Sequence, residues 1–397
     1  MRVLLTGQVG LDKSVYLAEA QRLAQEHGRK LDFESIGPLM IENYAGVITE
    51  TTILNLQKVV VDTLRMCAWK DILHQSARME AADDFIVNTH SVFRWHHGLI
   101  PALDLEAVSA YRPDLIIVLI DDIARVKAGM KARRTDFFKL WELLAWREEE
   151  VWFSKHLCDS VGSVTKGRTE FYVLPQAQGS SLLVQLLERQ DDHPKRVYLS
   201  FPMTGITNAV KEKTDAFKES MRENFVAFDP GGISERNLIT TYNTVEEEIR
   251  EHCASALESV AGCQPSEGVL WAPYVDRDTA LCLVKMTFAD SPDVPLLGRE
   301  LQQAFDAIDS QIISRDYLLI DQSDLVIIYI RAEEDGSPGI SAGCQSELDY
   351  AYHTGKAVFG IFSGDTKKLS PWVTKFSRVF STVDDAKEYV LETYAKR

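Results

Sequence analysis

The chain has 397 residues, of which 45% are hydrophobic and 26% are charged, and its formal net charge is −16. That length exceeds one ordinary hydrophobic core and favours a globular protein of two domains. The negative charge disfavours nucleic acids and membranes as partners, because both carry negative charge themselves. The six cysteines lack metal or disulfide spacing, the N-terminus does not resemble a signal peptide, and no apolar run reaches the roughly 20 residues of a membrane span. We therefore expect a cytoplasmic protein.

In the first half, apolar runs of buried type predict strands at residues 2–6, 31–35, 85–88, 115–120 and 170–174. Helical patterns lie between them at residues 13–27, 53–79, 103–111 and 137–157. This alternation predicts a doubly wound α/β domain with a parallel sheet, which we place at residues 1–190. A polar stretch with a proline, residues 188–196, ends the first half.

The first strand runs into Gly7-Gln-Val-Gly10-Leu-Asp12-Lys13-Ser14, which fits the P-loop pattern except at one position. In such a loop the backbone N–H groups hold phosphates, Lys13 neutralises them, and Ser14 would bind Mg²⁺. Asp12 stands where glycine is expected and brings a carboxylate towards the phosphates. The loop therefore predicts ATP or another nucleotide, with Mg²⁺, as the ligand.

Segments further along the chain extend this pattern. Residues 33–40, the strand that ends in Asn88-Thr-His90, and Arg112-Pro-Asp114 before the next strand follow in order. Together with the loop they make residues 1–188 resemble adenylate kinases and related nucleoside monophosphate kinases, particularly the archaeal kind. The resemblance implies a lid whose arginines clamp phosphates, and it places them at Arg125, Arg133, Arg134 and Arg147.

Asn88 departs from that family, which has an aspartate near Mg²⁺ at this position. With Asp12, it leaves two interpretations open. The domain is either an altered but working kinase, in which Asp12 replaces part of the metal site, or a degenerate kinase that binds a nucleotide as a sensor or delivery module. We favour the second slightly. His90 is the one histidine whose position supports a role in the site.

In the second half, strands are predicted at residues 197–201, 225–228, 325–329, 358–362 and 378–380. Helices are predicted at residues 208–224, 245–260, 299–310, 346–353 and 383–395. These elements predict a second doubly wound domain, of flavodoxin or Rossmann type, at residues 196–397. Residues 231–300 are too long for a simple crossover, and we interpret them as an insertion that covers the site or forms a dimer contact.

Glu347 follows a loop of small residues, Ser341-Ala-Gly343-Cys-Gln-Ser, which comes after an apolar strand. This order places a carboxylate on the first turn of a helix at the carboxyl end of the sheet, where ligands of open α/β sheets bind. The alternative is a helix-capping carboxylate at position N3, with a serine as the N-cap. Two other features favour a ligand site: Asp316 lies shortly before the central strand, and the entry strand ends in a polar loop from Ser200 to Gly205 that can present N–H groups to a substrate.

Three motifs together carry a second resemblance: Tyr198-Leu-Ser-Phe-Pro-Met-Thr-Gly205, Asp316 followed by Ser323-Asp324, and Ser341-x-Gly343-x-x-x-Glu347-Leu-Asp-Tyr-Ala351. They make residues 196–395, apart from 231–300, resemble the nucleoside 2-deoxyribosyltransferase family, including the 2'-deoxynucleoside 5'-phosphate N-hydrolases. Members of that family often build their sites across subunits, so the resemblance also implies a homo-oligomer.

The resemblance implies that Glu347 is a nucleophile that attacks C1' of the sugar and is then released by water or a second base. Asp316 would hold the sugar or pass a proton to the base. Ser341 and the N–H groups near Gly343 would take a 5'-phosphate or a 5'-hydroxyl, and Tyr198 would stack on or orient the base. No cofactor or metal is implied for this half.

We therefore expect a protein of nucleotide metabolism that cleaves or transfers the N-glycosidic bond of a nucleoside or its 5'-monophosphate, fused to a domain that binds a nucleotide. One alternative is a nucleoside monophosphate kinase with a non-catalytic second half. Another is a regulatory or defence protein that senses nucleotides at both sites.

Overall fold

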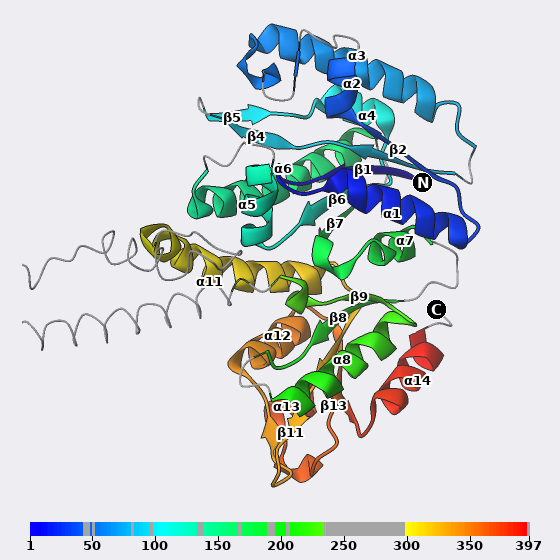
Figure 1. Cartoon of the computed structure of the whole chain (residues 1–397). Helices are drawn as coiled ribbons and strands as arrows, with labels where there is room; N and C mark the ends of the chain where they lie inside the picture. The colour runs from blue at the N-terminus through cyan, green and yellow to red at the C-terminus, as the bar shows by residue number, and fades with distance from the viewer. Residues whose placement is uncertain are drawn as a thin grey trace, which may run out of the picture. The chain divides into compact units, whose positions relative to one another are not determined.

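The computed structural model describes residues 1–42, 48–49, 52–80, 83–95, 98–132, 138–165, 169–188, 195–203, 207–233, 235 and 298–394. These residues form an α/β protein with two five-stranded parallel sheets (Figure 1). The chain divides into two compact units. The first comprises Met1–Asp121, Arg147–Ile233 and Ile313–Arg397 and contains both sheets, and the second comprises Asp122–Trp146 and Ser234–Ile312. The boundary near residue 190 between two domains stays a prediction.

The first sheet has the order β2-β3-β1-β6-β7. Its strands are β1 (Arg2–Thr6), β2 (Leu31–Ser35), β3 (Asp84–Asn88), β6 (Leu115–Ile120) and β7 (Glu170–Pro175). The helices of this half are α1 (Lys13–Glu26), α2 (Ile36–Glu42), α3 (Lys58–Ser76), α4 (Leu105–Tyr111), α5 (Ile123–Ala132), α6 (Leu140–Thr165) and α7 (Ser181–Leu187). Apolar side chains of α3, α4 and α6 pack on one face of the sheet, and this burial supplies the main stabilising term.

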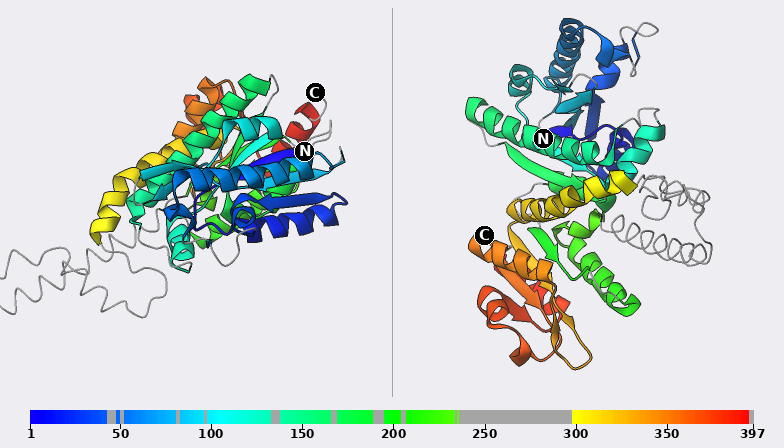
Figure 2. Two further views of the ribbon diagram at one scale, coloured as in Figure 1. Left: turned by 90° about the horizontal axis from the view of Figure 1, so that it is seen from above. Right: turned by 90° about the vertical axis from the view of Figure 1, so that its left-hand side faces the viewer.

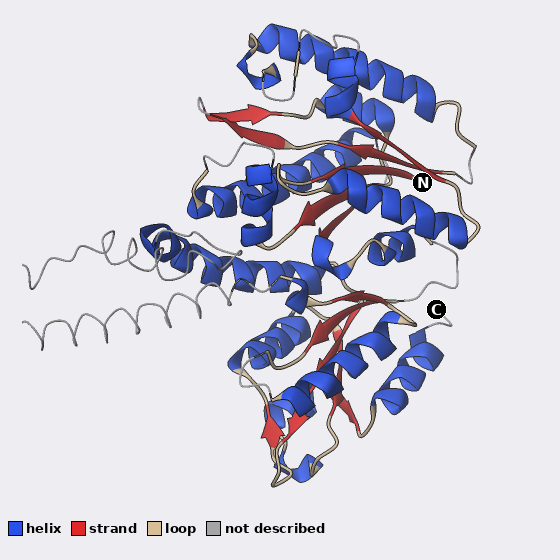
Figure 3. Ribbon diagram, in the orientation of Figure 1, coloured by secondary structure: helices blue, strands red, loops and turns tan. Residues whose placement is uncertain are grey.

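The second sheet has the order β14-β13-β10-β8-β9. Its strands are β8 (Arg196–Ser200), β9 (Val226–Phe228), β10 (Leu325–Tyr329), β13 (Ala357–Ile361) and β14 (Arg378–Phe380). The helices are α8 (Asn208–Arg222), α11 (Gly298–Asp321), α12 (Ala342–His353), α13 (Pro371–Phe376) and α14 (Val383–Tyr394). Apolar residues of α8 and α14 form a core with the sheet. Helix α12 packs against β10 and β13, and the ribbon of this half is drawn in Figures 2 and 3.

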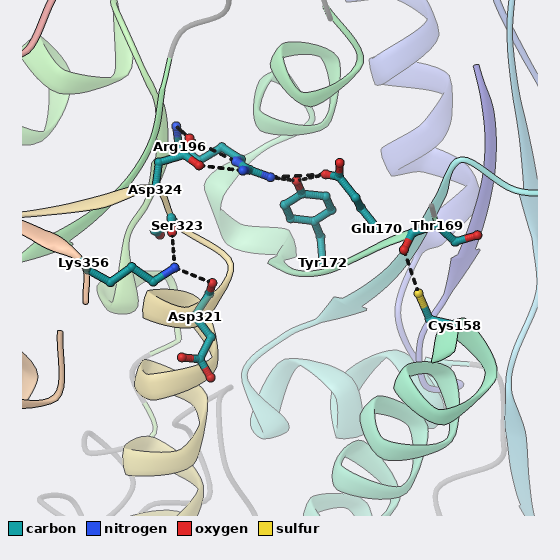
Figure 4. Close-up of polar contacts among 9 residues, drawn as sticks. All are labelled: Cys158, Thr169, Glu170, Tyr172, Arg196, Asp321, Ser323, Asp324 and Lys356. Atoms are coloured by element: carbon teal, nitrogen blue, oxygen red, sulfur yellow. Dashed lines mark hydrogen bonds and ion pairs between the residues drawn. The ribbon is translucent and has the colours of Figure 1, made fainter. Parts of the chain in front are cut away.

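Side chains at the end of α11 connect the two sheets within the first unit. The amide of Gln322 accepts a bond from Val173 N at 2.9 Å and donates to Val173 O at 3.0 Å, so it pairs with the main chain of the edge strand β7. Arg196 at the start of β8 forms an ion pair with Asp324 at 2.6 Å and another with Glu170 of β7 at 3.2 Å (Figure 4). These contacts fix the end of α11 against both sheets.

All ten strands expected from the sequence are present, and β6 and β10 are the continuous apolar runs typical of buried parallel strands. The helix predictions were less accurate. The helix expected at residues 53–79 is a 3-10 turn (Ile53–Asn55) and α3, since Leu56 and Gln57 are extended, with ψ of 159° and 139°. The helix expected at 299–310 continues to Asp321, because no glycine or proline interrupts it after Gly298.

Several elements escaped the sequence analysis. They are α2, α5, α13, and two short hairpins formed by β4 (Val92–Trp95) with β5 (Gly98–Pro101) and by β11 (Arg331–Ala332) with β12 (Pro338–Gly339). Ser370 and Pro371 cap the start of α13, so a helix-start signal was present in the sequence. The helix expected at 245–260, and most of the insertion expected at 231–300, lie outside the described residues.

The loop after β1 requires glycine at position 7. Gly7 has φ of +144°, and a Cβ there would lie 2.5 Å from the Leu119 carbonyl oxygen. Gly28, by contrast, has φ of +74° and open space around the same position. Gly28→Ala should therefore cost only the local backbone strain, about 1–2 kcal/mol. Gly7→Ala should cost more, above about 3 kcal/mol, because backbone atoms must move as well. Urea unfolding of both variants tests this, and equal losses would contradict it.

Candidate functional site

The entry strand of the second sheet divides its side chains between two faces. Val197 and Leu199 belong to the apolar core with α8 and α14. Because side chains alternate along a strand, Tyr198 and Ser200 point to the opposite face. Both are completely buried. Ser200 is the last residue of β8, so its hydroxyl lies at the carboxyl end of the parallel sheet, where ligands of such sheets bind.

Glu347 meets this face from α12. Its Oε2 accepts a hydrogen bond of 2.5 Å from the Ser200 hydroxyl, and the side chain is 7% exposed. The prediction of a first-turn position was wrong, because α12 begins at Ala342 and Glu347 lies on the second turn. The capping alternative is therefore excluded as well. The N-cap is Ser341, whose Oγ accepts from Cys344 N at 3.2 Å.

Asp316 reaches the same place from α11. It is 5% exposed and paired with Arg315, whose Nε and Nη2 both donate to Oδ1, at 3.0 and 2.9 Å. The remaining Arg315 nitrogen, Nη1, donates to the Ile233 carbonyl at 3.2 Å. Asp316 is thus a buried, held side chain and not a solvated aspartate at a helix end.

Each of the two carboxylates is held through one oxygen. Ser200 occupies Oε2 of Glu347 and Arg315 occupies Oδ1 of Asp316. Among the described residues, no hydrogen bond of good geometry reaches Oε1 of Glu347 or Oδ2 of Asp316. The site therefore holds each carboxylate in place through one oxygen.

The electrostatics of the pair follow from burial. Burial and the nearby negative charge of Asp316 raise the pKa of Glu347 to about 8. Burial also raises the pKa of Asp316, and Arg315 opposes that rise. The groups interact strongly enough to titrate as a pair. At neutral pH the pair keeps one proton, a combination that supplies an acid and a nucleophile from two carboxyl groups.

Tyr198 completes the cluster. Its ring is completely buried in β8 and offers no surface on which a base could stack. Burial, followed by the charges of Glu347 and Asp316, holds its pKa well above 10, so the hydroxyl keeps its proton. The hydroxyl lies near Glu347 but has no partner of good hydrogen-bond geometry among the described residues. It is a buried donor directed at the carboxylates.

The other residues predicted for this site lie at its edge or outside the description. Gly343 is exposed in the first turn of α12, two residues after the N-cap Ser341, so unpaired N–H groups of the helix start lie there. Cys344, one turn before Glu347, is buried, and its pKa is raised to about 11 by burial and by Glu347. Gly205 lies outside the described residues.

In the first half, the structure brings the P-loop lysine to the end of β3. Lys13 is 5% exposed, and its Nζ donates to the Gly7 carbonyl at 2.8 Å and to the Thr89 carbonyl. His90 Nδ1 lies 2.6 Å from the same Gly7 oxygen, which can only accept, so Nδ1 carries a proton. Lys13 Nζ lies 3.2 Å from that nitrogen. In this arrangement the ammonium group is bound to the loop itself.

A second buried carboxylate, Glu150 of α6, shapes this loop. It is completely buried, and its Oε1 accepts from Gly7 N at 2.9 Å and from Ser91 N at 2.8 Å, while Oε2 accepts from Val92 N at 3.1 Å. Burial raises its pKa, and the charge of Lys13 opposes the rise. The sequence analysis missed Glu150, because it lies in the middle of a helix 143 residues from Gly7.

The two departures from the P-loop pattern differ in environment. Asp12 is the N-cap residue of α1, is exposed, and makes no capping bond with its side chain. Asn88 is 7% exposed, its Nδ2 donates to Ser35 Oγ at 3.0 Å, and its Oδ1 has no hydrogen-bond partner in the described part of the chain. Ser14 is exposed on the first turn of α1, and Gly10 has φ of +100°, as a loop that turns its N–H groups inward requires.

The structure describes two of the four predicted lid arginines, Arg125 and Arg147. Arg147 is 5% exposed, and its Nη1 donates to the Asp121 carbonyl at 3.3 Å. Arg125 is exposed on α5, which belongs to the second unit. Arg133 and Arg134 lie outside the described residues. Their roles stay predictions.

Comparison with known proteins gives no match: no protein-family model fits the chain, and no curated protein is significantly similar to it. Within the described ranges, no group of three or more His, Cys, Asp or Glu side chains is arranged to hold a metal ion. None of the helices in those ranges is long and apolar enough to cross a membrane.

The raised pKa of Glu347 predicts a stability effect with a defined sign. The folded protein holds a proton on this group up to about pH 8, whereas the unfolded chain loses it near 4.5. Stability therefore falls as pH rises from about 5 to about 8. Glu347→Gln, which cannot ionise, should be more stable than the natural protein at pH 9, by on the order of 3 kcal/mol, and similar to it at pH 4.5.

Thermal unfolding across pH 4.5–9 measures this difference. Asp349→Asn, on the exposed side of the same helix, is the matched control and should follow the natural protein at every pH. A stability difference between Glu347→Gln and the natural protein that is constant with pH would show that Glu347 ionises at the same pH in both states.

Proposed function

We propose that the second half of the chain is an N-glycosidase or deoxyribosyltransferase that acts on a nucleoside or a nucleoside 5'-monophosphate. The observation that carries the proposal is the pair of buried carboxylates, Glu347 and Asp316, each with one oxygen free of protein hydrogen bonds among the described residues. Most glycosidases break the glycosidic bond with a pair of carboxyl groups that flank it. The resemblance of residues 196–395 to nucleoside 2-deoxyribosyltransferases agrees with this chemistry.

In the proposed reaction the single proton of the pair moves to Asp316 when the substrate binds, and the ionised Glu347 attacks C1' as the bond from C1' to the base nitrogen breaks. The departing base takes the electron pair of that bond and accepts a proton, which Asp316 or water supplies. Ser200 holds the other oxygen of Glu347 and fixes the direction of attack. Water, or a second base, then attacks C1', the bond from C1' to Glu347 breaks and releases the carboxylate, and the Asp316 carboxylate takes the proton that the attacking group loses. The buried Tyr198 hydroxyl is a donor for the carboxylate that is restored.

The first half would bind a nucleotide at the loop from Gly7 to Ser14. The glycine geometry at Gly7 and Gly10 and the position of Lys13 fit a phosphate group, since the loop lies between β1 and the start of α1. Lys13 would exchange its carbonyl partners for phosphate oxygens. Ser14 and the unpartnered Oδ1 of Asn88 are hard oxygen donors of the kind that suits Mg²⁺.

A second candidate function is a nucleoside monophosphate kinase with a non-catalytic second half. The placement of Lys13, His90 and Glu150 around one loop favours a nucleotide site, but Asn88 and Asp12 replace groups that serve the metal in that family. Phosphoryl transfer is the activity that separates this candidate from a nucleotide sensor.

Replacement of Glu347 tests the glycosidase. Glu347→Ala should lower base release from nucleosides and 5'-monophosphates by at least about 1,000-fold, because the attacking group is removed. Chromatographic detection of free base from a panel of substrates is the measurement. Asp349→Ala, in the same helix but exposed, should keep the activity of the natural protein. Equal base release by the natural protein and by Glu347→Ala would refute the proposal.

Replacement of Lys13 tests the nucleotide site. Lys13→Met should weaken ATP binding by about 10- to 100-fold, because it removes a charged donor worth about 1.5–3 kcal/mol. Lys30→Met is the control, since Lys30 is 63% exposed and pairs with Asp83 elsewhere in the same half. Calorimetric titration with ATP, with and without Mg²⁺, gives both affinities. If the natural protein binds no nucleotide, the assignment of the loop fails.

A further inference from the structure

Arg315 has a polar arrangement that neither the motifs nor the proposed reaction explains. It stands directly before Asp316 in α11 and is 8% exposed, so almost all of a charged side chain is buried. A buried guanidinium is costly unless its donors are used. Here two of its nitrogens converge on a single oxygen, Oδ1 of Asp316, and the third bonds the Ile233 carbonyl.

This geometry is unusual for an arginine and a carboxylate. A two-pronged pair normally places one nitrogen on each carboxylate oxygen, which is the stronger arrangement. Arg315 instead directs Nε and Nη2 to the same oxygen. The consequence is that Oδ2 of Asp316 is left without a hydrogen bond from the described residues, although the side chain as a whole is buried.

We propose that Arg315 is a positioning residue of the Glu347 site, which anchors Asp316 by one oxygen to the chain at Ile233 and presents the other oxygen to the sugar and the leaving base. This inference rests on the proposed function of the site. It adds a role for a residue that does not itself touch the substrate.

The charge of Arg315 has a second effect at the site. Among the described residues, the charged or titratable groups that face the carboxylate pair are Tyr198 on β8, Cys344 on α12 and Arg315 on α11. Tyr198 and Cys344 both keep their protons at neutral pH because burial and the carboxylates raise their pKa values. Within the described part of the chain, Arg315 is therefore the positive charge beside the carboxyl pair, and it lowers the pKa of both Glu347 and Asp316.

This role predicts a change in pH dependence that a structural role alone would not produce. If the pair works with one proton, base release by the natural protein should decline above about pH 8, where Glu347 and Asp316 lose that proton. Arg315→Met removes the positive charge, and the decline of base release should therefore occur at a pH higher by about one to three units. Activity at the optimum should also fall, because Asp316 loses its anchor.

Three other variants complete the test. Arg315→Lys keeps the charge, so base release should decline at the same pH as in the natural protein. Its activity should stay below normal, because one ammonium group cannot replace the two guanidinium nitrogens that bond Asp316. Arg315→Gln removes the charge but keeps a donor, and it replaces Arg315→Met if that variant does not fold. Arg196→Met breaks the ion pairs to Asp324 and Glu170. It should lower stability and leave the pH at which base release declines unchanged.

Infrared titration of the protonated carboxyl band, without substrate, supplies a readout that does not depend on activity. Loss of this band should occur at higher pH in Arg315→Met than in the natural protein. A folded Arg315→Met variant with unchanged infrared titration and unchanged pH profile would overturn the inference. A second outcome separates the two proposals. If the carboxyl band disappears at higher pH in Arg315→Met but the natural protein releases no base from any substrate, the glycosidase proposal fails, and the effect of the Arg315 charge on the carboxyl pair is supported.

Discussion

The second half of the molecule depends on the burial of two carboxyl groups beside one guanidinium. Glu347 and Asp316 come from different helices, and both are at least nine-tenths buried. Two carboxylates cannot both ionise at low cost in such surroundings, so the pair retains a proton at neutral pH. Arg315 and Ser200 limit the cost by bonding one oxygen of each group. Holding two buried carboxyl groups in this way costs folding stability.

The first half also buries a carboxyl group, but different partners stabilise it. There the buried carboxylate of Glu150 receives three backbone N–H groups and the charge of Lys13. These groups stabilise the charge of Glu150, and its carboxylate shapes the loop at Gly7. Both halves place their polar side chains at the carboxyl ends of parallel strands, where the sheet leaves backbone groups open to a ligand. The two sites differ in their polar groups: Lys13 with its carbonyl partners in one, and two carboxyl groups beside Arg315 in the other.

Much of this arrangement could be predicted from the sequence, and the exceptions have physical reasons. The strands β1, β2, β6, β10 and β14 were expected with the bounds that they have. Of these, β6 and β10 are the apolar runs typical of buried parallel strands, whereas β2 and β14 are partly exposed. Strand ends then indicated Ser200 and Glu347, and the resemblance indicated Tyr198. Arg315 and Glu150 were not indicated, because their roles depend on contacts between distant segments, Arg315 with Ile233 and Glu150 with Gly7. The start of α12 was misplaced by four residues, since Ser346 and Ser341 are both acceptable N-caps and only packing chooses between them.

The central claim is that Glu347 forms a covalent bond with the sugar. Intact-mass spectrometry of the protein after incubation with a 2'-fluoro-2'-deoxynucleoside 5'-monophosphate tests it directly, because fluorine destabilises the positive charge that develops at C1' when the intermediate breaks down. We predict a mass increase equal to the fluorinated sugar phosphate, located by peptide mapping at Glu347 and absent from Glu347→Gln. Release of base by the natural protein with an adduct at another residue, or an equal adduct in Glu347→Gln, would contradict the account.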